Sequence, residues 1–245
     1  MELKIIGTGS SGNAYVLENE KEALLIEAGV RFSEIKKALD FNVQKVAGCI
    51  VSHSHGDHAK SISDVLKSGI NVYASTDTFQ NFGVAINHKT HFLYQGASYS
   101  IGGFKILPFE VKHDVPCLGF LISHSDCGKV LFLTDTYYCE YKFKDLNNII
   151  IEANYSKEII DRKFGTDSKM EFLRNRILRS HFSLAHCKEM LSANDLSKVN
   201  NIVLIHLSDS NSDERQFKSE VEQLTGKNVS VASNGMKLKF NKTPF

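Results

Sequence analysis

Four side chains able to bind a metal ion lie within six residues of this sequence. They are His53, His55, Asp57 and His58. An apolar segment typical of a buried strand, 47–51, comes directly before them. Imidazole nitrogens and carboxylate oxygens are ligands that zinc, manganese and iron accept in proteins. A solvated loop rarely concentrates such ligands, so the run predicts a metal site at the end of a core strand. Gly56 is expected to let the backbone turn tightly enough for the four side chains to face one point.

Three more polar residues follow apolar segments further along the chain. His113 comes after 106–112, Asp135 after 130–134 and His206 after 202–205. Sites in α/β sheets gather at strand ends, so we expect these residues to lie near the first cluster. The seven ligands are enough for two metal ions, with a carboxylate such as Asp135 able to bridge them. Two cations stabilise the oxygens of a displacement while a bridging water is deprotonated near neutral pH.

The charge and cysteine content exclude several classes of protein. The chain has 245 residues, with 29 Lys and Arg against 28 Asp and Glu, a net charge of +1. That balance excludes a strongly basic nucleic-acid binder, although a local basic patch remains open. Five scattered cysteines without a C-x-x-C pair are typical of reduced thiols in a cytoplasmic protein. No apolar run approaches the ~20 residues of a membrane span, so we expect a cytoplasmic protein with no membrane partner.

Strand-like and helix-like segments succeed each other over the whole chain, which is interpreted as one domain, 1–245. Short apolar runs rich in β-branched residues predict strands at 3–6, 14–17, 23–26, 48–51, 71–73, 104–111, 119–122, 130–133, 149–151, 202–205 and 229–232. Helical periodicity predicts helices at 31–39, 60–67, 157–163, 169–179, 184–193 and 212–224. Ser183 is a predicted N-cap, and Asp209, Ser210 or Ser212 could cap the last helix. This order indicates a layered α/β architecture of two sheets with helices outside.

A glycine-rich segment, Gly7–Gly12, matches the dinucleotide-binding pattern G-x-G-x-x-G. That pattern requires a helix next, but 13–18 and 21–27 have the character of two strands joined by a polar turn. We therefore interpret the segment as a turn inside a β-meander. Its backbone N–H groups could still bind a phosphate, which makes Ser10, Ser11 and Asn13 candidates for phosphate binding or for support of the metal site.

These motifs together resemble the metallo-β-lactamase fold superfamily, from the Gly7–Asn13 turn to the segment 229–238. The H-x-H-x-D-H signature is specific to that superfamily but not to one reaction within it. The resemblance implies a four-layer αββα sandwich. It implies one metal held by His53, His55 and His113, a second held by Asp57, His58 and His206, and Asp135 as the bridge. The family usually has Asp where this chain has Glu27, a residue that supports the metal loop from behind.

Within the superfamily, the sequence resembles the phosphodiesterase branch. His113-Asp-Val-Pro-Cys-Leu-Gly-Phe is similar to the third-ligand segment of ribonuclease Z and the related 5′-exonucleases, and Asp135 is similar to their shared carboxylate. Glu152 and His181 stand where ribonuclease Z-like enzymes have a Glu and His near the leaving group. The resemblance implies phosphodiester hydrolysis by a metal-bridged hydroxide, with Asp57, Glu152 and His181 as catalytic residues. Glu152 would hold His181, the general acid that protonates the leaving oxygen.

The substrate and the metal remain open at this stage. The one sizeable inserted stretch is about 155–179, interpreted as two helices with a break at Gly165. This leaves no room for a large nucleic-acid clamp, and with the balanced charge it favours a small or cyclic nucleotide. The alternative is a single-strand 5′-exonuclease or a tRNA 3′-processing ribonuclease. More distant alternatives are a lactonase or thioesterase, or a non-catalytic metal-binding module. Zinc is the expected metal, with manganese second, and the resemblance implies a homodimer.

The other histidines, His88, His91, His124 and His186, lack ligand spacing and are expected at the surface or in packing. A basic group precedes His181 along the chain. It consists of Arg174, Arg176 and Arg179. Two interpretations of this group stay open, a solvated helix face and a contact to a substrate phosphate.

Overall fold

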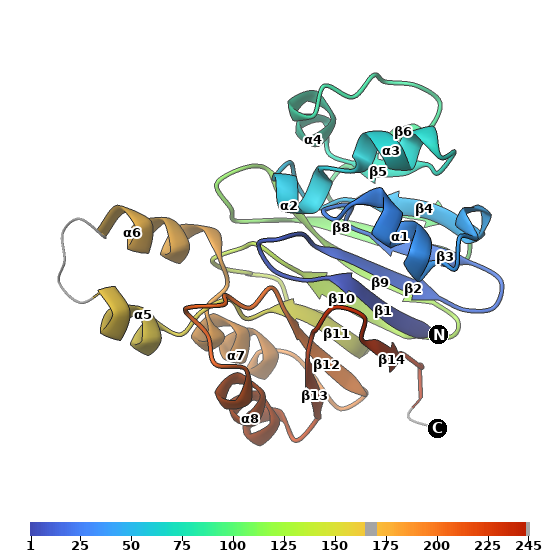
Figure 1. Ribbon diagram of the computed structural model, residues 1–245. Coiled ribbons are helices and arrows are strands. Elements are labelled where there is room, and N and C mark those ends of the chain that lie inside the picture. The colour runs from blue at the N-terminus through green and yellow to red at the C-terminus, as the bar shows by residue number, and fades with distance from the viewer. Residues whose placement is uncertain (165–170, 244–245) are drawn as a thin grey trace.

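The computed structural model describes residues 1–164 and 171–243. In this part of the chain two seven-stranded sheets lie face to face, and helices cover the outer face of each sheet (Figure 1). The layers therefore follow the predicted αββα order. Gly165, at the predicted break between two helices, falls outside the described residues.

The first sheet has the order β14-β1-β2-β3-β4-β5-β6. Its strands are β1 (Glu2–Gly7), β2 (Ala14–Glu18), β3 (Ala23–Ile26), β4 (Val46–Ile50), β5 (Val72–Ala74), β6 (Thr90–Phe92) and β14 (Lys237–Lys239). Strands β14, β1, β2 and β3 pair antiparallel, and β3 to β6 run parallel. Because β3 and β4 run parallel, the residues that follow them leave the sheet at the same edge.

The second sheet repeats this plan in the order β13-β12-β11-β10-β9-β8-β7. Its strands are β7 (Tyr99–Ile101), β8 (Phe104–Val111), β9 (Cys117–His124), β10 (Gly128–Leu133), β11 (Leu146–Glu152), β12 (Asn201–Ile205) and β13 (Asn228–Val231). Strands β7 to β10 pair antiparallel, and β10 to β13 run parallel. Every residue of β11 is buried, as expected for a parallel strand covered on both faces.

Helices from the first part of the chain cover the first sheet and the last two helices cover the second, whereas the two helices between them pack on each other and project from one end of the sandwich (Figure 1). The helices are α1 (Phe32–Ala38), α2 (Gly56–Ala59), α3 (Ile62–Lys67), α4 (Thr76–Asn81), α5 (Lys157–Phe164), α6 (Glu171–Ser180), α7 (Leu184–Ser192) and α8 (Glu214–Thr225), with a short 3₁₀ turn at Val43–Lys45. Ser183 caps α7 as predicted, because its side chain accepts a hydrogen bond from the backbone N of His186. The predicted caps of α8 are wrong, since Asp213 caps it.

The main core lies between the two sheets, where the inward faces of their strands meet. Tyr15 of β2 and Phe132 of β10 pack edge to face there, with ring centroids 5.7 Å apart. Two further apolar clusters join each sheet to its own helices. The site described below lies at one end of this sandwich, where strands of both sheets stop.

The glycine-rich segment forms the turn between β1 and β2, as predicted for a β-meander. Gly9 and Gly12 have φ of 101° and 146°, which other residues rarely adopt. A Cβ on Gly12 would lie 2.0 Å from the backbone oxygen of Gly29. The segment is therefore a tight turn packed on the loop after β3, and no helix follows it.

The five cysteines are free thiols, as the sequence predicts. Among the described helices, none has the length and apolar character needed to span a bilayer.

Candidate metal centre and its neighbours

The predicted ligands leave the ends of strands from both sheets and meet in one place. Residues 53–58 follow β4 of the first sheet, and His113, Asp135 and His206 follow β8, β10 and β12 of the second. A cavity of about 170 Å³ opens between them. It is lined by Ser10, His55, Asp57, His113, Asp114, Asp135, Arg176, Ser180, His181 and His206. His53 and His58 are buried beside it.

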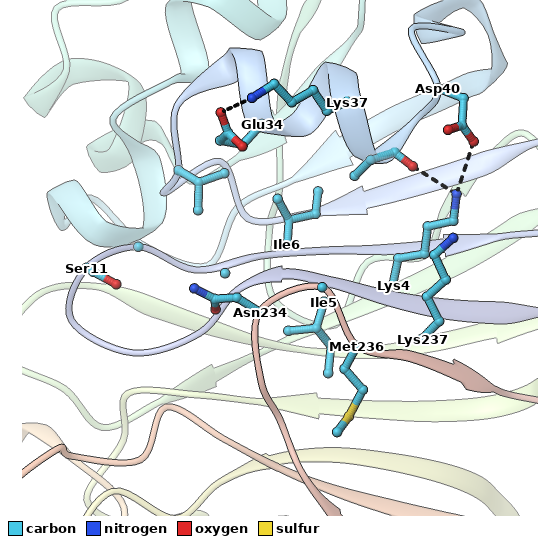
Figure 2. Close-up of a pocket in the computed structure, with 15 residues that line it drawn as sticks. Lys4, Ile5, Ile6, Ser11, Glu34, Lys37, Asp40, Asn234, Met236 and Lys237 are labelled. Atoms are coloured by element: carbon cyan, nitrogen blue, oxygen red, sulfur yellow. Dashed lines mark hydrogen bonds and ion pairs between the residues drawn. The ribbon is translucent and has the colours of Figure 1, made fainter.

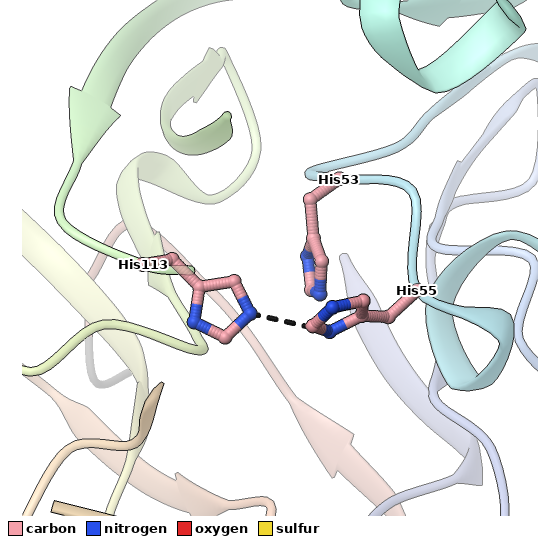
Figure 3. Close-up of side chains that lie close together, drawn as sticks. All are labelled: His53, His55 and His113. Atoms are coloured by element: carbon pink, nitrogen blue, oxygen red, sulfur yellow. Dashed lines mark hydrogen bonds between the residues drawn. The ribbon is translucent and has the colours of Figure 1, made fainter. Parts of the chain in front are cut away.

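The first group of ligands contains the three histidines His53, His55 and His113 (Figure 3). One ligand atom from each lies within 4.8 Å of the others. His113 Nε2 is 3.2 Å from His55 Nδ1. His53 Nδ1 is 2.8 Å from the hydroxyl of Ser52, which fixes the ring and leaves Nε2 for another partner.

The second group contains Asp57, His58 and His206, again within 4.8 Å of one another. Asp57 Oδ2 lies 3.5 Å from His58 Nε2 and 3.6 Å from His206 Nε2. Asp135 stands between the two groups. Its Oδ2 is 2.9 Å from His58 Nε2 and 3.0 Å from His206 Nδ1, and it also clusters with His53. Both groups thus have the composition that the resemblance implies.

Unpartnered nitrogens show that this donor set fits divalent cations. Nε2 of His53 and Nε2 of His206 are buried without a hydrogen-bond partner. Leaving such an atom unsatisfied costs about 1–3 kcal/mol, which a bound cation would offset. Burial alone would raise the pKa of Asp135, but His206 and His58 hold that pKa well below its usual range, so the carboxylate is ionised. Nitrogen and carboxylate ligands in this number suit two cations.

Three of the residues at these strand ends have a left-handed backbone. Glu27, Asp135 and His206 have φ of 65°, 45° and 54°. Such conformations cost of order 1–3 kcal/mol each and gather at functional sites. The strained backbone of His206 is held by Asn154 Nδ2, which donates to its carbonyl at 2.7 Å, and by Thr8 Oγ1, which accepts from its N–H at 2.9 Å. Sequence reasoning missed Asn154, although it is a polar residue two positions past the last residue of β11.

Glu27 and Asn13 contact the segment 52–58, the metal loop, without lining the cavity of the metal ligands. The buried Glu27 carboxylate accepts a hydrogen bond from the backbone N of Ser52, at 3.2 Å and 3.3 Å from its two oxygens. Its Oε2 lies 3.6 Å from His58 Nδ1. Asn13 Nδ2 lies 3.1 Å from His58 Nε2. The longer arm of Glu27 therefore still reaches the loop that bears the ligands.

The two serines of the glycine-rich turn face different cavities. Ser10 lines the cavity of the metal ligands. Ser11 instead lines a separate cavity of about 580 Å³ between α1, β1 and the loop before β14, where Lys4 and Lys37 are paired with acidic side chains (Figure 2). The carbonyl oxygen of Ser11 accepts a hydrogen bond from Lys60 Nζ at 2.9 Å. The structure therefore does not place Ser11 beside a substrate in the metal centre.

The role predicted for Gly56 is wrong. Gly56 is the first residue of α2, its φ is not left-handed, and a Cβ there would meet nothing within 4 Å. The close approach falls instead at Gly29, where a Cβ would lie 1.6 Å from the carbonyl oxygen of Asp57. That carbonyl also accepts a hydrogen bond from the backbone N of Asn13 at 2.7 Å. Gly29 therefore allows the loop after β3 to pack on the metal loop.

Alanine at Gly29 is expected to destabilise the protein by about 1–3 kcal/mol and to reduce its metal content, because the methyl group would push the Asp57 backbone away. Alanine at Gly56 serves as the control, because a Cβ there would meet nothing within 4 Å and stability should change by no more than about 0.5 kcal/mol. Urea unfolding with metal analysis measures both. Equal stability and metal content in the two variants would contradict this account of the loop.

His181 and Glu152 form a pair at the edge of the cavity. His181 Nδ1 is 2.8 Å from Glu152 Oε1 and 3.1 Å from Asp135 Oδ1. The other Glu152 oxygen accepts a hydrogen bond from the backbone N of Phe182 at 3.1 Å. Burial alone lowers the pKa of His181, but the carboxylates of Glu152 and Asp135 raise it to about 10. With Nδ1 occupied, Nε2 is the atom of His181 left for a substrate.

The remaining histidines lie outside this centre, as predicted. His91 stacks on Tyr73 with ring centroids 4.5 Å apart, and His124 Nε2 lies 3.3 Å from Glu22. His88 is exposed, and His186 packs against Phe182. Asp114, which the sequence analysis did not select, lines the cavity with Oδ1 3.0 Å from His113 Nε2. Its position directly after a predicted ligand was the available signal.

Two sheets enclosed by helices, with histidine and aspartate ligands at the strand ends, define the metallo-β-lactamase fold. The chain belongs to the family described as the β-lactamase superfamily domain, which it matches over residues 24–207. The predicted superfamily, its nuclease and phosphodiesterase branch, and the fold are thereby confirmed.

Similar proteins extend over nearly the whole chain. Exodeoxyribonuclease WalJ of Streptococcus pneumoniae serotype 2 (strain D39 / NCTC 7466) is 27% identical over 244 residues, 93% of this chain and 89% of the relative. The metallo-β-lactamase fold protein YhfI from Bacillus subtilis has a TM-score of 0.70 and 16% identity, covering 97% of this chain and 99% of that one. Human tRNase Z, short form, has a TM-score of 0.65 and 16% identity, covering 98% and 99%. At these identities the two structures show a shared fold.

Proposed function

We propose that the protein is a metal-dependent phosphodiesterase that cleaves nucleic-acid strands from an end, with His181 as general acid. The observation that carries the proposal is the cluster of seven ligands for two cations beside the Glu152–His181 pair, with five of the seven and His181 lining one cavity. A metal-dependent phosphoester hydrolase is also the class of enzyme to which its named relatives belong.

The positions of the ligands assign them to two metal sites. His53, His55 and His113 would hold one cation, and Asp57, His58 and His206 the other, with Asp135 shared. When bound, two divalent cations neutralise charge on a phosphoryl group and lower the pKa of water.

Glu152 fixes Nδ1 of His181 and thereby orients Nε2 toward the substrate. From there His181 can donate a proton to the leaving oxygen of the diester. Asp57 orients the second group of ligands through its contacts with His58 and His206.

A nucleic-acid strand is favoured as the substrate because the relative similar over 93% of this chain is an exodeoxyribonuclease. A cleft that accepts a strand end can act with a modest groove, so the net charge of +1 is compatible with it. DNA is therefore the first polymer to test, with RNA as the comparison.

A small or cyclic nucleotide is the second candidate substrate. The cavity of about 170 Å³ and the balanced charge favour it, because neither indicates a long track of phosphate contacts.

Zinc is the proposed metal, with manganese as the alternative, because histidine-rich sites suit zinc. A homodimer and a cytoplasmic location stay predictions from the sequence.

The proposal predicts that chelation abolishes diester cleavage and that Zn²⁺ or Mn²⁺ restores it. Metal-free and reloaded protein are assayed on single-stranded DNA and RNA labelled at either end, cyclic mononucleotides, bis-p-nitrophenyl phosphate and lactones. Reloaded protein should shorten DNA stepwise from one end. Cleavage of cyclic nucleotides alone would favour the second candidate. Turnover of lactones alone, or full metal loading with no turnover of any ester, would refute phosphodiester hydrolysis.

A further inference from the structure

Helix α6 brings three neighbouring residues to the metal-ligand cavity. Arg176 and Ser180 line it from one face of the helix, since residues four positions apart lie one above the other. His181 follows at the end of α6, where its backbone N donates to the carbonyl of Ile177 at 3.2 Å. The Ser180 hydroxyl donates to the Arg176 carbonyl at 2.8 Å. The element that positions the general acid thus also places an arginine beside the reacting group.

The three arginines of α6 have different environments. Arg174 is paired with Asp161 of α5 at 2.7 Å and holds the two helices together. Arg179 is exposed and does not line the cavity. Arg176 is exposed as well, but it lines the cavity, and its guanidinium has no carboxylate partner in the described part of the chain. Of the three arginines, only Arg176 is therefore placed to contact a substrate phosphate.

The charges of the groups that line the cavity make Arg176 the side chain best suited to bind an anion there. Its other charged lining groups are the carboxylates Asp57, Asp114 and Asp135, and the histidines. Among the described residues of this lining, Arg176 alone carries a permanent positive charge. The cavity of about 170 Å³ is smaller than the roughly 300–1,000 Å³ of pockets that enclose a drug-sized ligand. It therefore admits a phosphate group, while the attached nucleosides remain outside.

We propose that Arg176 binds the non-bridging oxygens of the scissile phosphate in this cavity. A guanidinium is suited to this because its N–H groups can donate two parallel hydrogen bonds to a phosphate. The inference rests on the proposed function and adds to it a residue that selects phosphodiesters over uncharged esters. A contact to the scissile phosphate is expected to be independent of the base and of strand length.

Three variants test the assignment in the zinc-loaded protein. They are Arg176→Ala, Arg176→Lys and Arg179→Ala, the last a matched control that removes the same charge from the same helix. Each is assayed on bis-p-nitrophenyl phosphate and on single-stranded DNA. Binding of inorganic phosphate is measured separately by titration calorimetry. Metal content and thermal unfolding confirm that each variant is folded and loaded.

Arg176→Ala is expected to lower kcat/KM by about 10- to 100-fold on both substrates and to weaken phosphate binding by a similar factor. Arg176→Lys should recover part of each loss. Arg179→Ala should stay within about twofold of the wild type.

Several results would overturn the assignment. One is an Arg176→Ala variant that matches Arg179→Ala, and another is a loss confined to DNA, which would place the contact on a flanking phosphate. Loss of folding or metal in Arg176→Ala, with no recovery in Arg176→Lys, would show a structural role instead. If the wild type cleaves no diester, the proposed function fails, while phosphate binding still decides the role of Arg176.

Discussion

Asparagine in place of Asp135 is expected to lower diester hydrolysis by about 10²- to 10⁴-fold, the effect of losing several kcal/mol of transition-state stabilisation. Asp135 contacts His58 and His206 of the second group and clusters with His53 of the first, so its charge serves both groups of ligands. Asparagine keeps the shape and tolerates the left-handed backbone that Asp135 adopts. The loss of activity in Asp135→Asn therefore measures the role of the carboxylate charge and not a change in the backbone. Steady-state kinetics and metal analysis measure it, and bound metal should fall below two per chain.

The matched control is Asp145→Asn. Asp145 also has a left-handed backbone, with φ of 60°, but it is exposed and pairs with Lys129 and Lys198. This variant should retain its metal and full activity. Wild-type turnover by Asp135→Asn with two bound cations would remove the argument for a shared carboxylate.

Alanine in place of His181 is expected to act selectively, according to the leaving group. With DNA, whose alkoxide must be protonated as it departs, kcat should fall by about 10²- to 10⁴-fold. With bis-p-nitrophenyl phosphate the loss should be small, because nitrophenolate leaves without a proton. The pair of substrates thus separates proton donation from metal binding, which both substrates require.

The exposed His88 provides the control for this experiment, since it belongs to none of the ligand clusters in the described chain. His88→Ala should leave both rates unchanged. If His181→Ala slows the two substrates equally, His181 is a binding or positioning group and the proposed acid must be sought elsewhere.

The long elements of the fold could be predicted because each has its own pattern. The eleven predicted strands and six predicted helices all overlap observed elements, with ends that match or differ by at most three residues. Strands 23–26 and 104–111 match at both ends, and residues 169 and 170 of the predicted helix 169–179 lie outside the described part of the chain. Strands β6, β7 and β14 were missed. Each has three residues and includes polar or charged ones, as in Lys-Leu-Lys of β14. Such edge strands form because a neighbouring strand offers hydrogen bonds, which no local pattern reveals. Helices α2 and α4 are too short to show a helical period.

That the candidate ligands lie together could be predicted, because histidine and aspartate directly after apolar strands are rare combinations of chemistry and position. The residues that hold these ligands in place could not be predicted. Ser52 and Asn154 act through one hydrogen bond each, and nothing in their type distinguishes them from other polar residues. The importance of Gly29 arises from the backbone of Asp57, a contact between distant parts of the chain. The left-handed backbones of Asp135 and His206 likewise depend on packing.

The division of the ligands between two sheets has a consequence for synthesis of the protein. Residues 53–58 belong to the part of the chain that is translated first, whereas His113, Asp135 and His206 emerge later. An incomplete polypeptide on the ribosome therefore lacks the full coordination set until β12 has been made and has joined its sheet. An unfinished chain would thus lack the proposed nuclease activity while it is still close to the messenger RNA that encodes it.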